Sequence, residues 1–331
     1  MKESRPYAFS KIYEGKDIRV FYFGMENERI LMTFTQWANK PPRKPFYPTV
    51  AHVAGMGFIG FVSLRNHRWQ TPELPEAFDA IKKILRSNHS ITTFGVSMGG
   101  TGAIFASQFI DVKRVIAVAP RPTSAPSSNL ELGDEESASF ASEVASPFEA
   151  QERMIIKLSQ NISDRTEINI LYDPFYKVDT PFVEIIEAAR GKVKRWPLPF
   201  ANHTPLLELK QSGLLREFTQ KAIVDNDING AHALYRRARY ENGLFSYNAS
   251  LRRNCLQLRK NRPQHFDVLN NHISSYGPNY TWLEARAAFL AFEKKYLLAA
   301  RDYEHCETLT GRKKFAKLAE KMRAAHTRLG L

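Results

Sequence analysis

The sequence is poor in cysteine and in long apolar runs. Only Cys255 and Cys306 occur among its 331 residues, which excludes a small fold held by several disulfides and is typical of a reducing compartment. No stretch of about 18 apolar residues is present, so we expect no transmembrane helix. The N-terminal segment lacks the apolar core of a secretory signal. Together these features predict a cytoplasmic protein.

Motifs for bound nucleotides and metals are also missing. The sequence contains no G-x-x-x-x-G-K-[ST] loop, no H-E-x-x-H pair and no Cys/His cluster with the spacing of metal ligands. A phosphate-binding loop or a metal centre needs those residue types at those spacings. We therefore expect no metal and no organic cofactor, and we expect no nucleic acid as a partner.

Acidic residues are scarce in the last third of the chain. Residues 226–331 hold 19 Lys and Arg against 9 Asp and Glu, and so carry +10 of the formal net charge of +13. A basic surface of this kind attracts anionic partners. We predict an anionic or protein partner for this region, and the alternative is a solvated helical surface that is rich in Lys and Arg.

The first 225 residues alternate runs typical of strands with runs typical of helices. The predicted strands are short and rich in Ile, Val and Phe, as expected for a sheet buried on both faces; they are Ile18–Gly24, Arg29–Thr35, Gly57–Leu64, Ser90–Gly95, Val112–Ala119, Glu167–Tyr172 and Val193–Pro197. The predicted helices are Leu74–Arg86, Met98–Phe109, Pro147–Ser159 and Thr180–Arg190. This alternation predicts an α/β fold with a mostly parallel sheet flanked by helices.

The rest of the chain favours helix throughout. Its predicted helices are Ala231–Tyr240, Ala249–Lys260, Gln264–Ser275, Trp282–Glu304 and Lys313–Arg328. The segment Ala285–Gly311 has the spacing of one tetratricopeptide helix-turn-helix unit. We therefore predict two domains, an α/β domain over 1–225 and a basic helical domain over 226–331. The Ser-, Pro- and acid-rich segment Pro122–Ser146 is expected above the sheet, either as a substrate-gating loop or as a plain surface loop.

One motif carries nucleophilic chemistry. The β-like run from Ser90 ends in the residues GVSMG (95–99), and a helix of small and apolar residues follows. This is G-x-S-x-G in the strand–turn–helix setting that the motif requires. A serine on such a sharp turn needs glycine neighbours, because larger residues would collide with the strand and the helix. The helix N-terminus then faces the site, so we expect the backbone N–H of Met98 to stabilise an oxyanion.

The sequence FGVSMGG around Ser97 resembles the nucleophile elbow of the α/β-hydrolase family. The resemblance covers about Arg19 to Gly213 and leaves the C-terminal third unexplained. It implies a triad in the chain order serine, acid, histidine, and the hydrolysis of an ester or another acyl compound.

The expected base is His203, which lies in a loop after the last predicted strand. Two aspartates after the preceding strand compete for the role of the acid. Asp179 precedes a helix, and the arrangement of the two aspartates is similar to that of small hydrolases in which the second serves the histidine. We favour Asp179, with Asp173 as the alternative acid or as a residue that shapes the loop. Either carboxylate would orient the imidazole and stabilise its protonated form.

The remaining site residues are assigned by position. A second oxyanion donor normally follows an early central strand, which points to the N–H of Gln36, although the usual His-Gly is absent there. Substrate contacts are expected at the carboxyl ends of the strands, from Trp37, Asn66, His67 and Trp69. The guanidinium groups of the arginines in the 65–70 segment can donate paired hydrogen bonds to an oxyanion, and a tryptophan ring can stack on the face of a sugar. The alternative is a loop that only packs on its neighbours.

These residues predict a serine hydrolase that cleaves an ester through an acyl-enzyme, on a glycan or a small acylated substrate. An acyltransferase with the same triad is the first alternative, because the acyl group can pass to a hydroxyl or an amine in place of water. The second is a non-catalytic scaffold, which a large distance between Ser97 Oγ and any imidazole nitrogen would favour.

Overall fold

The computed structural model describes most of the chain. The described residues are 7–36, 42, 44–65, 67–121, 162–176, 179–190, 193–201, 203, 205–211, 213–241, 253–255, 257–258, 263–278 and 280–330. They fall into two compact units, one reaching to Ala238 and one beginning at Arg239. The predicted Pro122–Ser146 loop and the predicted helix Pro147–Ser159 lie outside the described residues.

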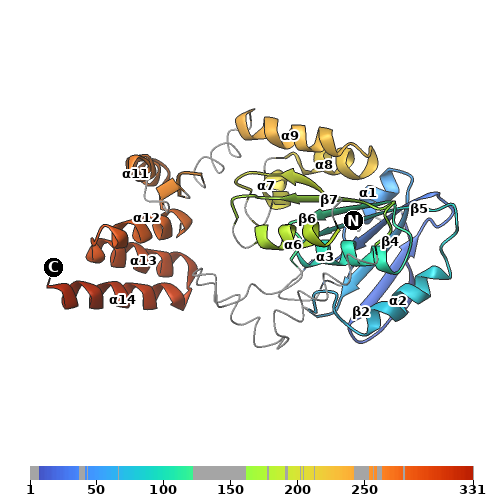
Figure 1. Ribbon diagram of the computed structural model, residues 1–331, viewed down its shortest axis with the longest axis horizontal. Helices are drawn as coiled ribbons and strands as arrows, with labels where there is room; N and C mark the ends of the chain where they lie inside the picture. Colours follow the sequence, from blue (N-terminus) through green and yellow to red (C-terminus); the bar gives the residue numbers. More distant parts are fainter. Residues whose placement is uncertain are drawn as a thin grey trace, which may run out of the picture. The chain divides into compact units, whose positions relative to one another are not determined.

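The first unit contains an eight-stranded, mostly parallel sheet (Figure 1). Its strands are β1 Ser10–Glu14, β2 Ile18–Phe23, β3 Arg29–Phe34, β4 Gly57–Ser63, β5 Ser90–Val96, β6 Arg114–Val118, β7 Glu167–Tyr172 and β8 Val193–Pro197. They are ordered β1-β2-β4-β3-β5-β6-β7-β8. Strand β2 is antiparallel to both β1 and β4, and the other neighbours are parallel. This confirms the predicted fold class.

The seven predicted strands are all present, within two residues at their ends. The additional strand, β1, is short and largely exposed. It therefore lacks the buried apolar run by which the other strands were recognised. Strands β3 to β7 are almost fully buried, because helices cover both faces of the sheet.

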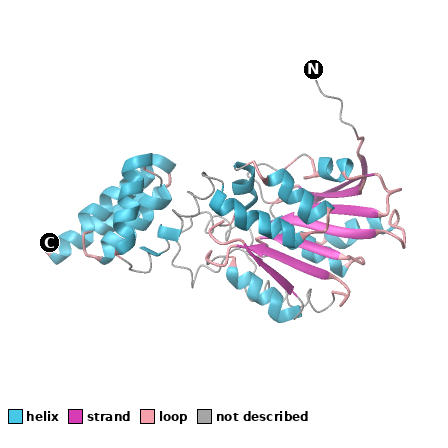
Figure 2. Ribbon diagram, turned by 90° about the horizontal axis from the view of Figure 1, so that it is seen from above, coloured by secondary structure: helices cyan, strands magenta, loops and turns pink. Residues whose placement is uncertain are grey.

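The helices of the first unit lie on both faces of the sheet (Figure 2). They are α1 Pro48–Val53, α2 Glu73–Lys82, α3 Met98–Phe105, α6 Thr180–Arg190, α7 Pro205–Gln211, α8 Leu215–Thr219 and α9 Ile228–Glu241, with a 3-10 turn at Ala106–Gln108 and a π-helical turn at Gln220–Val224. One continuous core joins α2, α3 and α6 to the sheet, with Phe78, Ile104 and Ile186 among its buried members. The opposite face packs on α1, where Tyr47 meets the ring of Phe94 edge-on at 4.9 Å.

Helix α9 packs with the sheet of the first unit, although the sequence assigned it to the C-terminal region. His232 Nε2 is 2.7 Å from the carbonyl oxygen of Pro197, at the end of β8. The hydroxyl of Tyr235 donates to the carbonyl of Pro199 at 2.8 Å. These bonds satisfy backbone acceptors in the segment that leads from β8 to His203, so α9 supports the loop that carries the predicted base.

The second unit contains four described helices, namely α11 Gln264–Tyr276, α12 Tyr280–Phe292, α13 Tyr296–Thr310 and α14 Lys313–Leu329. Leu283, Tyr303 and Phe315 pack in its core. Arg286 donates to both carboxylate oxygens of Asp302 at 2.7 Å, which ties α12 to α13.

The prediction of one continuous helix over Trp282–Glu304 is wrong. The segment bends into a helix-turn-helix at residues 293–295, where Lys294 adopts a left-handed φ of 59°. Helical periodicity continues across the turn and did not reveal it, whereas the helix-turn-helix spacing of Ala285–Gly311 had indicated two helices here. The described part of the chain contains no helix that is both long and apolar enough to cross a membrane.

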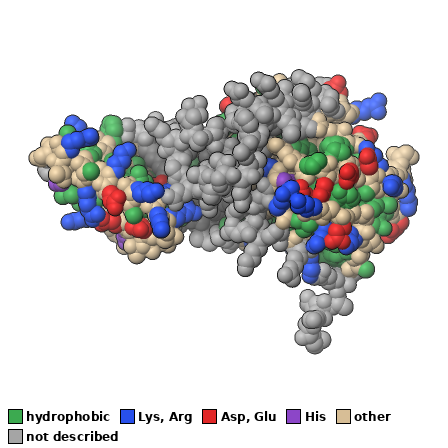
Figure 3. Space-filling model, turned by 90° about the horizontal axis from the view of Figure 1, so that it is seen from below, with side chains coloured by type: hydrophobic (Ala, Val, Ile, Leu, Met, Phe, Trp, Pro, Cys, Tyr) green, Lys and Arg blue, Asp and Glu red, His purple; other side chains and the backbone are tan. Residues whose placement is uncertain are grey.

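The basic side chains of the second unit do not form one continuous patch on the face drawn in Figure 3. Figure 3 shows Lys and Arg side chains of this unit interspersed with acidic and apolar side chains on the face drawn. Several of them pair locally, as Arg323 does with Glu304. The anionic or protein partner of this region stays a prediction.

The parallel sheet brings distant parts of the chain to one edge. Strands β3 to β8 run in the same direction, so the residues that follow them share the carboxyl edge of the sheet. Ser97 follows β5, Arg121 comes after β6, Asp179 after β7 and His203 after β8. The loop that follows β4 opens on the same edge. This edge holds the candidate site.

Candidate active site

Ser97 occupies a strained turn between β5 and α3. Its backbone has φ 53° and ψ −121°, a combination that non-glycine residues rarely adopt. Its N–H donates to the carbonyl of Val118 at 2.8 Å, and its own carbonyl accepts the N–H of Arg121 at 3.2 Å. Backbone bonds to the neighbouring strand therefore hold the turn from both sides.

The glycines of the motif are required by close backbone contacts. A Cβ on Gly95 would lie 1.9 Å from the carbonyl oxygen of Gly99, and a Cβ on Gly99 would lie 2.4 Å from that of Phe34. Both distances are far inside van der Waals contact. Helix α3 can begin directly behind Ser97 because neither position carries a side chain.

The structure brings the three predicted triad residues together. Ser97 Oγ is 2.8 Å from His203 Nε2. His203 Nδ1 is 2.8 Å from Asp179 Oδ2 and 3.0 Å from Oδ1. A carboxylate only accepts hydrogen bonds, so Nδ1 carries the proton and Nε2 is left to accept the hydroxyl hydrogen of Ser97. Asp179 is 0% exposed, which shields its bond to the imidazole from water.

Asp173 shapes the loop after β7. Its carboxylate oxygen Oδ1 accepts the N–H of Phe175 at 2.9 Å, and its carbonyl accepts the N–H of Tyr176 at 3.1 Å. This is the turn-forming arrangement that aspartate favours. The carboxylate that contacts His203 is that of Asp179, and its role as the acid stays a prediction.

Arg121 was not predicted, yet it reaches the same cluster. Its Nε donates to Asp179 Oδ1 at 3.3 Å and its Nη2 donates to the hydroxyl of Tyr176 at 3.3 Å. The guanidinium lies over the Tyr176 ring, 5.9 Å from its centroid. The sequence feature that could have pointed to Arg121 is its position just after β6, which lies next to β5, the strand that leads to Ser97.

Comparison with known proteins identifies solved structures only. No family model matches the chain, and no curated protein matches its sequence. The capsule O-acetyltransferase of Neisseria meningitidis serogroup A matches at 15% identity and a TM-score of 0.48, over 68% of this chain and 97% of its own. The Glycosylation Associate Protein (Gap123) complex from Streptococcus agalactiae matches at 16% identity and 0.50, over 64% of this chain and 45% of the matched chain. The Pyrococcus furiosus esterase Pf2001 matches at 12% identity and 0.40, over 64% and 87%.

Identities this low bear on the fold alone. The match at a TM-score of 0.50, the mostly parallel sheet and the strand–turn–helix around Ser97 agree with one another. The chain has an α/β-hydrolase fold. The predicted resemblance of the FGVSMGG segment to this family's nucleophile elbow is therefore confirmed at the level of the fold.

In this hydrolase fold, both predicted oxyanion donors lie beside the elbow. Met98 is the first residue of α3, so its N–H is among the four that have no acceptor within the helix. Gln36 follows the end of β3, which α3 approaches so closely that a Cβ on Gly99 would lie 3.2 Å from the carbonyl oxygen of Thr35. Their roles as donors stay predictions.

A pocket of about 330 Å³ opens beside the elbow. Its lining is mostly apolar and consists of Phe34, Gln36, Phe46, Tyr47, Phe94, Gly95 and Val96. Burial raises the pKa of Tyr47 to about 12, so its hydroxyl stays protonated at neutral pH. Val96 immediately precedes Ser97, so the pocket lies next to the turn that carries this serine.

The predicted substrate contacts in the loop after β4 need correction. Trp69 is 1% exposed and its ring meets that of Phe34 edge-on at 5.1 Å, so it has no face to offer a sugar. His67 uses both ring nitrogens inside the protein: Nδ1 accepts the N–H of Trp69 at 3.0 Å, and Nε2 lies 3.2 Å from the carbonyl oxygen of Asp17. Trp37 and Asn66 lie outside the described residues.

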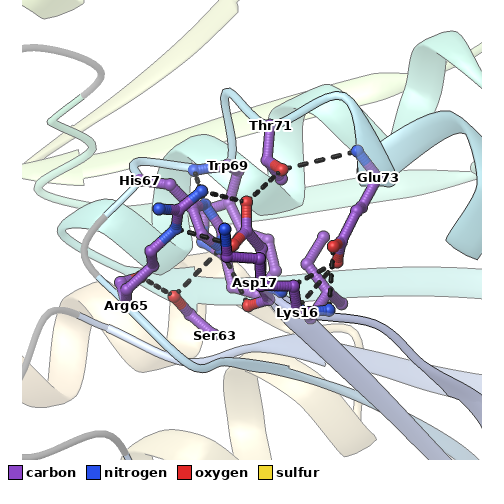
Figure 4. A network of polar contacts seen from close by, with 9 residues as sticks. Lys16, Asp17, Ser63, Arg65, His67, Trp69, Thr71 and Glu73 are labelled. Atoms are coloured by element: carbon purple, nitrogen blue, oxygen red, sulfur yellow. Dashed lines mark hydrogen bonds and ion pairs between the residues drawn. The ribbon is translucent and has the colours of Figure 1, made fainter.

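Asp17 is the centre of the network that holds this loop (Figure 4). Its carboxylate pairs with Arg65 at 2.6 and 2.7 Å and accepts the hydroxyl of Thr71 at 2.7 Å. Burial acts to raise the pKa of Asp17, but the hydrogen bonds from Arg65 and Thr71 outweigh it and hold the pKa below its usual range. Glu73 accepts the N–H of Asp17 at 2.9 Å. Together with His67, these bonds fix the loop to the start of β2.

Burial lowers the pKa of His67, and this has a consequence for stability. Because the folded-state pKa lies below the unfolded value of about 6.5, the unfolded state binds more protons once the pH falls below that value. The contribution of a neutral His67 is thus present above pH 6.5 and is lost on acidification.

Among the described residues, no group of three or more His, Cys, Asp or Glu side chains could hold a metal ion.

The first prediction concerns the elbow. Gly95→Ala should lower the free energy of unfolding by at least the roughly 1–3 kcal/mol typical of overpacked cores, because its Cβ meets backbone atoms that cannot rotate away. Gly213→Ala is the control, since its Cβ would meet nothing within 4 Å and only its φ of 74° is unfavourable, at about 1–2 kcal/mol. Chemical denaturation measures both. Equal losses would contradict the packing argument.

The second prediction concerns the loop. His67→Asn keeps an acceptor for the N–H of Trp69 but removes the titrating ring. The wild type should lose stability as the pH falls from 7 to 5, and the variant should show a flatter slope over that range, measured by denaturation at each pH. The further loss that begins below pH 3.8, where Asp17 of the unfolded chain takes up a proton before Asp17 of the folded protein does, should remain in the variant. Identical slopes between pH 7 and 5 would exclude His67 as the source.

Proposed function

We propose that the protein is a serine hydrolase that cleaves carboxylic esters, with Ser97 as nucleophile, His203 as general base and Asp179 as the acid that orients it. The observation that carries the proposal is the 2.8 Å contact between Ser97 Oγ and His203 Nε2. Nucleophile, base and orienting acid are linked by hydrogen bonds in the arrangement that activates a serine hydroxyl.

The first step follows from the protonation states. Ser97 Oγ attacks the acyl carbon while its proton passes to His203 Nε2, and the carbonyl π electrons move to the oxygen. The N–H groups of Met98 and Gln36 are the proposed donors to this oxyanion. Collapse of the tetrahedral adduct breaks the ester bond. The proton on Nε2 passes to the departing alkoxide, which leaves as an alcohol, and the acyl group stays on Ser97 Oγ as an ester.

The second step regenerates the serine. Water gives a proton to His203 Nε2 and attacks the acyl carbon, and the adduct then releases a carboxylic acid as Ser97 regains its proton. In both steps the imidazolium forms next to the buried Asp179 carboxylate, which stabilises it. Acyl transfer differs only in the acceptor, since a hydroxyl of a second substrate can replace water.

The pocket beside the elbow is the proposed acyl site. Its volume of about 330 Å³ is at the small end of ligand pockets, and apolar side chains line most of it. Such a pocket accommodates a short acyl chain. The glycan or small acylated molecule that supplies this acyl group stays a proposal.

The scaffold alternative predicted that the serine would lie far from any imidazole. The contacts of 2.8 Å on both sides of the ring weigh against it. So does the strained backbone of Ser97, because strain of this kind persists where it serves a site and a scaffold has no use for it.

The third prediction tests the nucleophile. A fluorophosphonate probe, which reacts with activated serines, should label the wild type and not Ser97→Ala, and p-nitrophenyl acetate hydrolysis should fall by roughly 10⁴-fold or more. Ser90→Ala, at the opposite end of β5, is the matched control and should be labelled normally. Labelling of Ser97→Ala at the wild-type level would end the proposal.

Adding an alcohol acceptor to the p-nitrophenyl acetate assay and analysing the products separates acyl transfer from hydrolysis.

The fourth prediction separates the two aspartates. Asp179→Asn should lower kcat by roughly 10⁴-fold, because an amide does not hold the imidazole in the tautomer that accepts the serine proton. Asp173→Asn keeps an oxygen that can accept the N–H of Phe175, so its rate should stay within about tenfold of wild type. Steady-state kinetics on one ester measures both variants. The reverse order would assign the acid to Asp173.

A further inference from the structure

Tyr47 adopts a strained backbone at the pocket beside the elbow. Its φ is 62° and its ψ is 22°, in the left-handed region that a bulky residue rarely occupies. Pro48 follows it as the first residue of α1, and a residue before proline normally prefers an extended conformation. Such strain is unfavourable by about 1–3 kcal/mol and persists only where neighbouring contacts impose it. The contacts that impose it lie in the segment before α1.

This segment crosses three neighbouring parallel strands. Gly60 in β4, Thr33 in β3 and Phe94 in β5 stand side by side in one row of the sheet. Pro45 packs on the first of them, since a Cβ on Gly60 would lie 2.2 Å from the Cβ of Pro45. The hydroxyl of Thr33 donates to the carbonyl of Phe46 at 3.0 Å. One residue of the segment thus lies over each of the first two strands, and the next residue reaches the third.

Tyr47 is the residue over β5, where its ring meets that of Phe94 edge-on at 4.9 Å. Phe94, Gly95 and Val96 follow one another in β5, and Tyr47 lines the pocket together with them. Phe94 is three residues before Ser97, which corresponds to about 10 Å along a strand. The phenol is therefore held at the part of the pocket that suits the far end of an acyl chain rather than its carbonyl carbon.

The hydroxyl of Tyr47 stands out in this wall. The only other polar side chain in the lining is that of Gln36, which is exposed. Among the residues that the structure describes, none forms a hydrogen bond with the Tyr47 hydroxyl, and burial alone raises its pKa. An occupant that excludes water from the pocket must therefore supply a partner for this hydroxyl or leave it unpaired, which is unfavourable.

The protonation state of Tyr47 limits the kind of partner. With a pKa of about 12 the phenol is neutral at neutral pH, so it can donate a hydrogen bond to an oxygen of the occupant. The lining contains no cationic side chain that would offset the burial of a carboxylate or phosphate. The pocket therefore suits a neutral oxygen, as in a ketone, an ether or an alcohol.

We propose that Tyr47 is a specificity residue that donates a hydrogen bond to a neutral oxygen on the acyl chain of the substrate. This rests on the proposed function, in which the pocket holds the acyl group, and it adds the substrate class: esters of short acyl chains that carry an oxygen. A site built to bind such an oxygen rejects the plain hydrocarbon chain, because that chain leaves the buried hydroxyl unpaired.

The fifth prediction compares p-nitrophenyl esters whose acyl chains have equal length. They are the pentanoate and three esters with one oxygen added to or replacing part of the chain, namely the ethoxyacetate, the 3-methoxypropanoate and the 4-oxopentanoate. The measured quantity is the ratio of kcat/KM for each oxygen-containing ester to that for the pentanoate. Tyr47→Phe should lower this ratio by about 3- to 30-fold for at least one of them, as expected for a lost hydrogen bond. The intrinsic reactivity of each ester cancels between wild type and variant.

Controls separate recognition from a role in catalysis or in the fold. Tyr47→Phe keeps the ring that contacts Phe94. Tyr13→Phe removes a hydroxyl that donates to Glu76 at the β1 edge of the sheet, and it should leave every ratio unchanged. If Tyr47→Phe lowers the rates of all four esters alike, the hydroxyl acts on the oxyanion or on stability, and the proposal is overturned. Unchanged ratios would overturn it too.

A binding measurement keeps this test independent of activity. Calorimetry measures the affinity of Ser97→Ala and of Ser97→Ala/Tyr47→Phe for the p-nitroanilides of the same four acids. The double variant should lose the preference for an oxygen-containing chain, and an equal preference in both proteins overturns the subsite even if no ester is hydrolysed. Hydrolysis without a preference that depends on Tyr47 would overturn the subsite and leave the serine hydrolase proposal in place.

Discussion

The close approach of helix α3 to strands β3 and β5 is the constraint on which the site depends. The backbone of Gly95 touches that of Gly99, and the backbone of Gly99 touches that of Phe34, at distances that leave no room for a Cβ. This contact forces the chain through the strained conformation of Ser97 and begins a helix directly behind its hydroxyl. The strained backbone of Ser97 and the helix N-terminus behind it therefore have one physical cause, the packing of that helix onto two parallel strands.

The parallel sheet supplies the second requirement, which is that residues far apart in the chain meet. Ser97 and His203 are 106 positions apart, and Asp179 is 24 positions before His203. They meet because each follows a strand of the same direction, and successive strands of the sheet place their carboxyl ends side by side. Helix α9 secures the last of these segments through backbone carbonyls of Pro197 and Pro199. The hydrogen-bonded chain from serine to carboxylate is thus a property of the whole first unit.

Charged side chains surround the hydrogen-bonded residues Ser97, His203 and Asp179 unevenly. The Asp17 network ties the loop after β4 to the start of β2 by bonds that lie away from Ser97. Its effect is to fix the turn that buries Trp69, in which Arg68 and Trp69 both adopt a left-handed φ. On the other side of the elbow, Arg121 joins the backbone of Ser97 to the carboxylate of Asp179. Cationic side chains therefore come from two separate loops of this edge, and Arg121 is set in place by Ser97 and Asp179 themselves.

The sequence by itself determined the fold class, seven of the eight strands, the elbow at Ser97 and the candidate base, because these depend on local apolar runs and on glycines within a few residues of the serine. Tertiary structure decided the rest. It placed the carboxylate of Asp179 rather than that of Asp173 against His203, gave the ring nitrogens of His67 partners inside the protein, buried Trp69 and brought Arg121 to Asp179. The reason is physical: whether a polar or aromatic side chain faces substrate or core depends on which distant groups satisfy it, and those partners, such as Asp17 for Arg65 or Phe34 for Trp69, come together only when the sheet has formed.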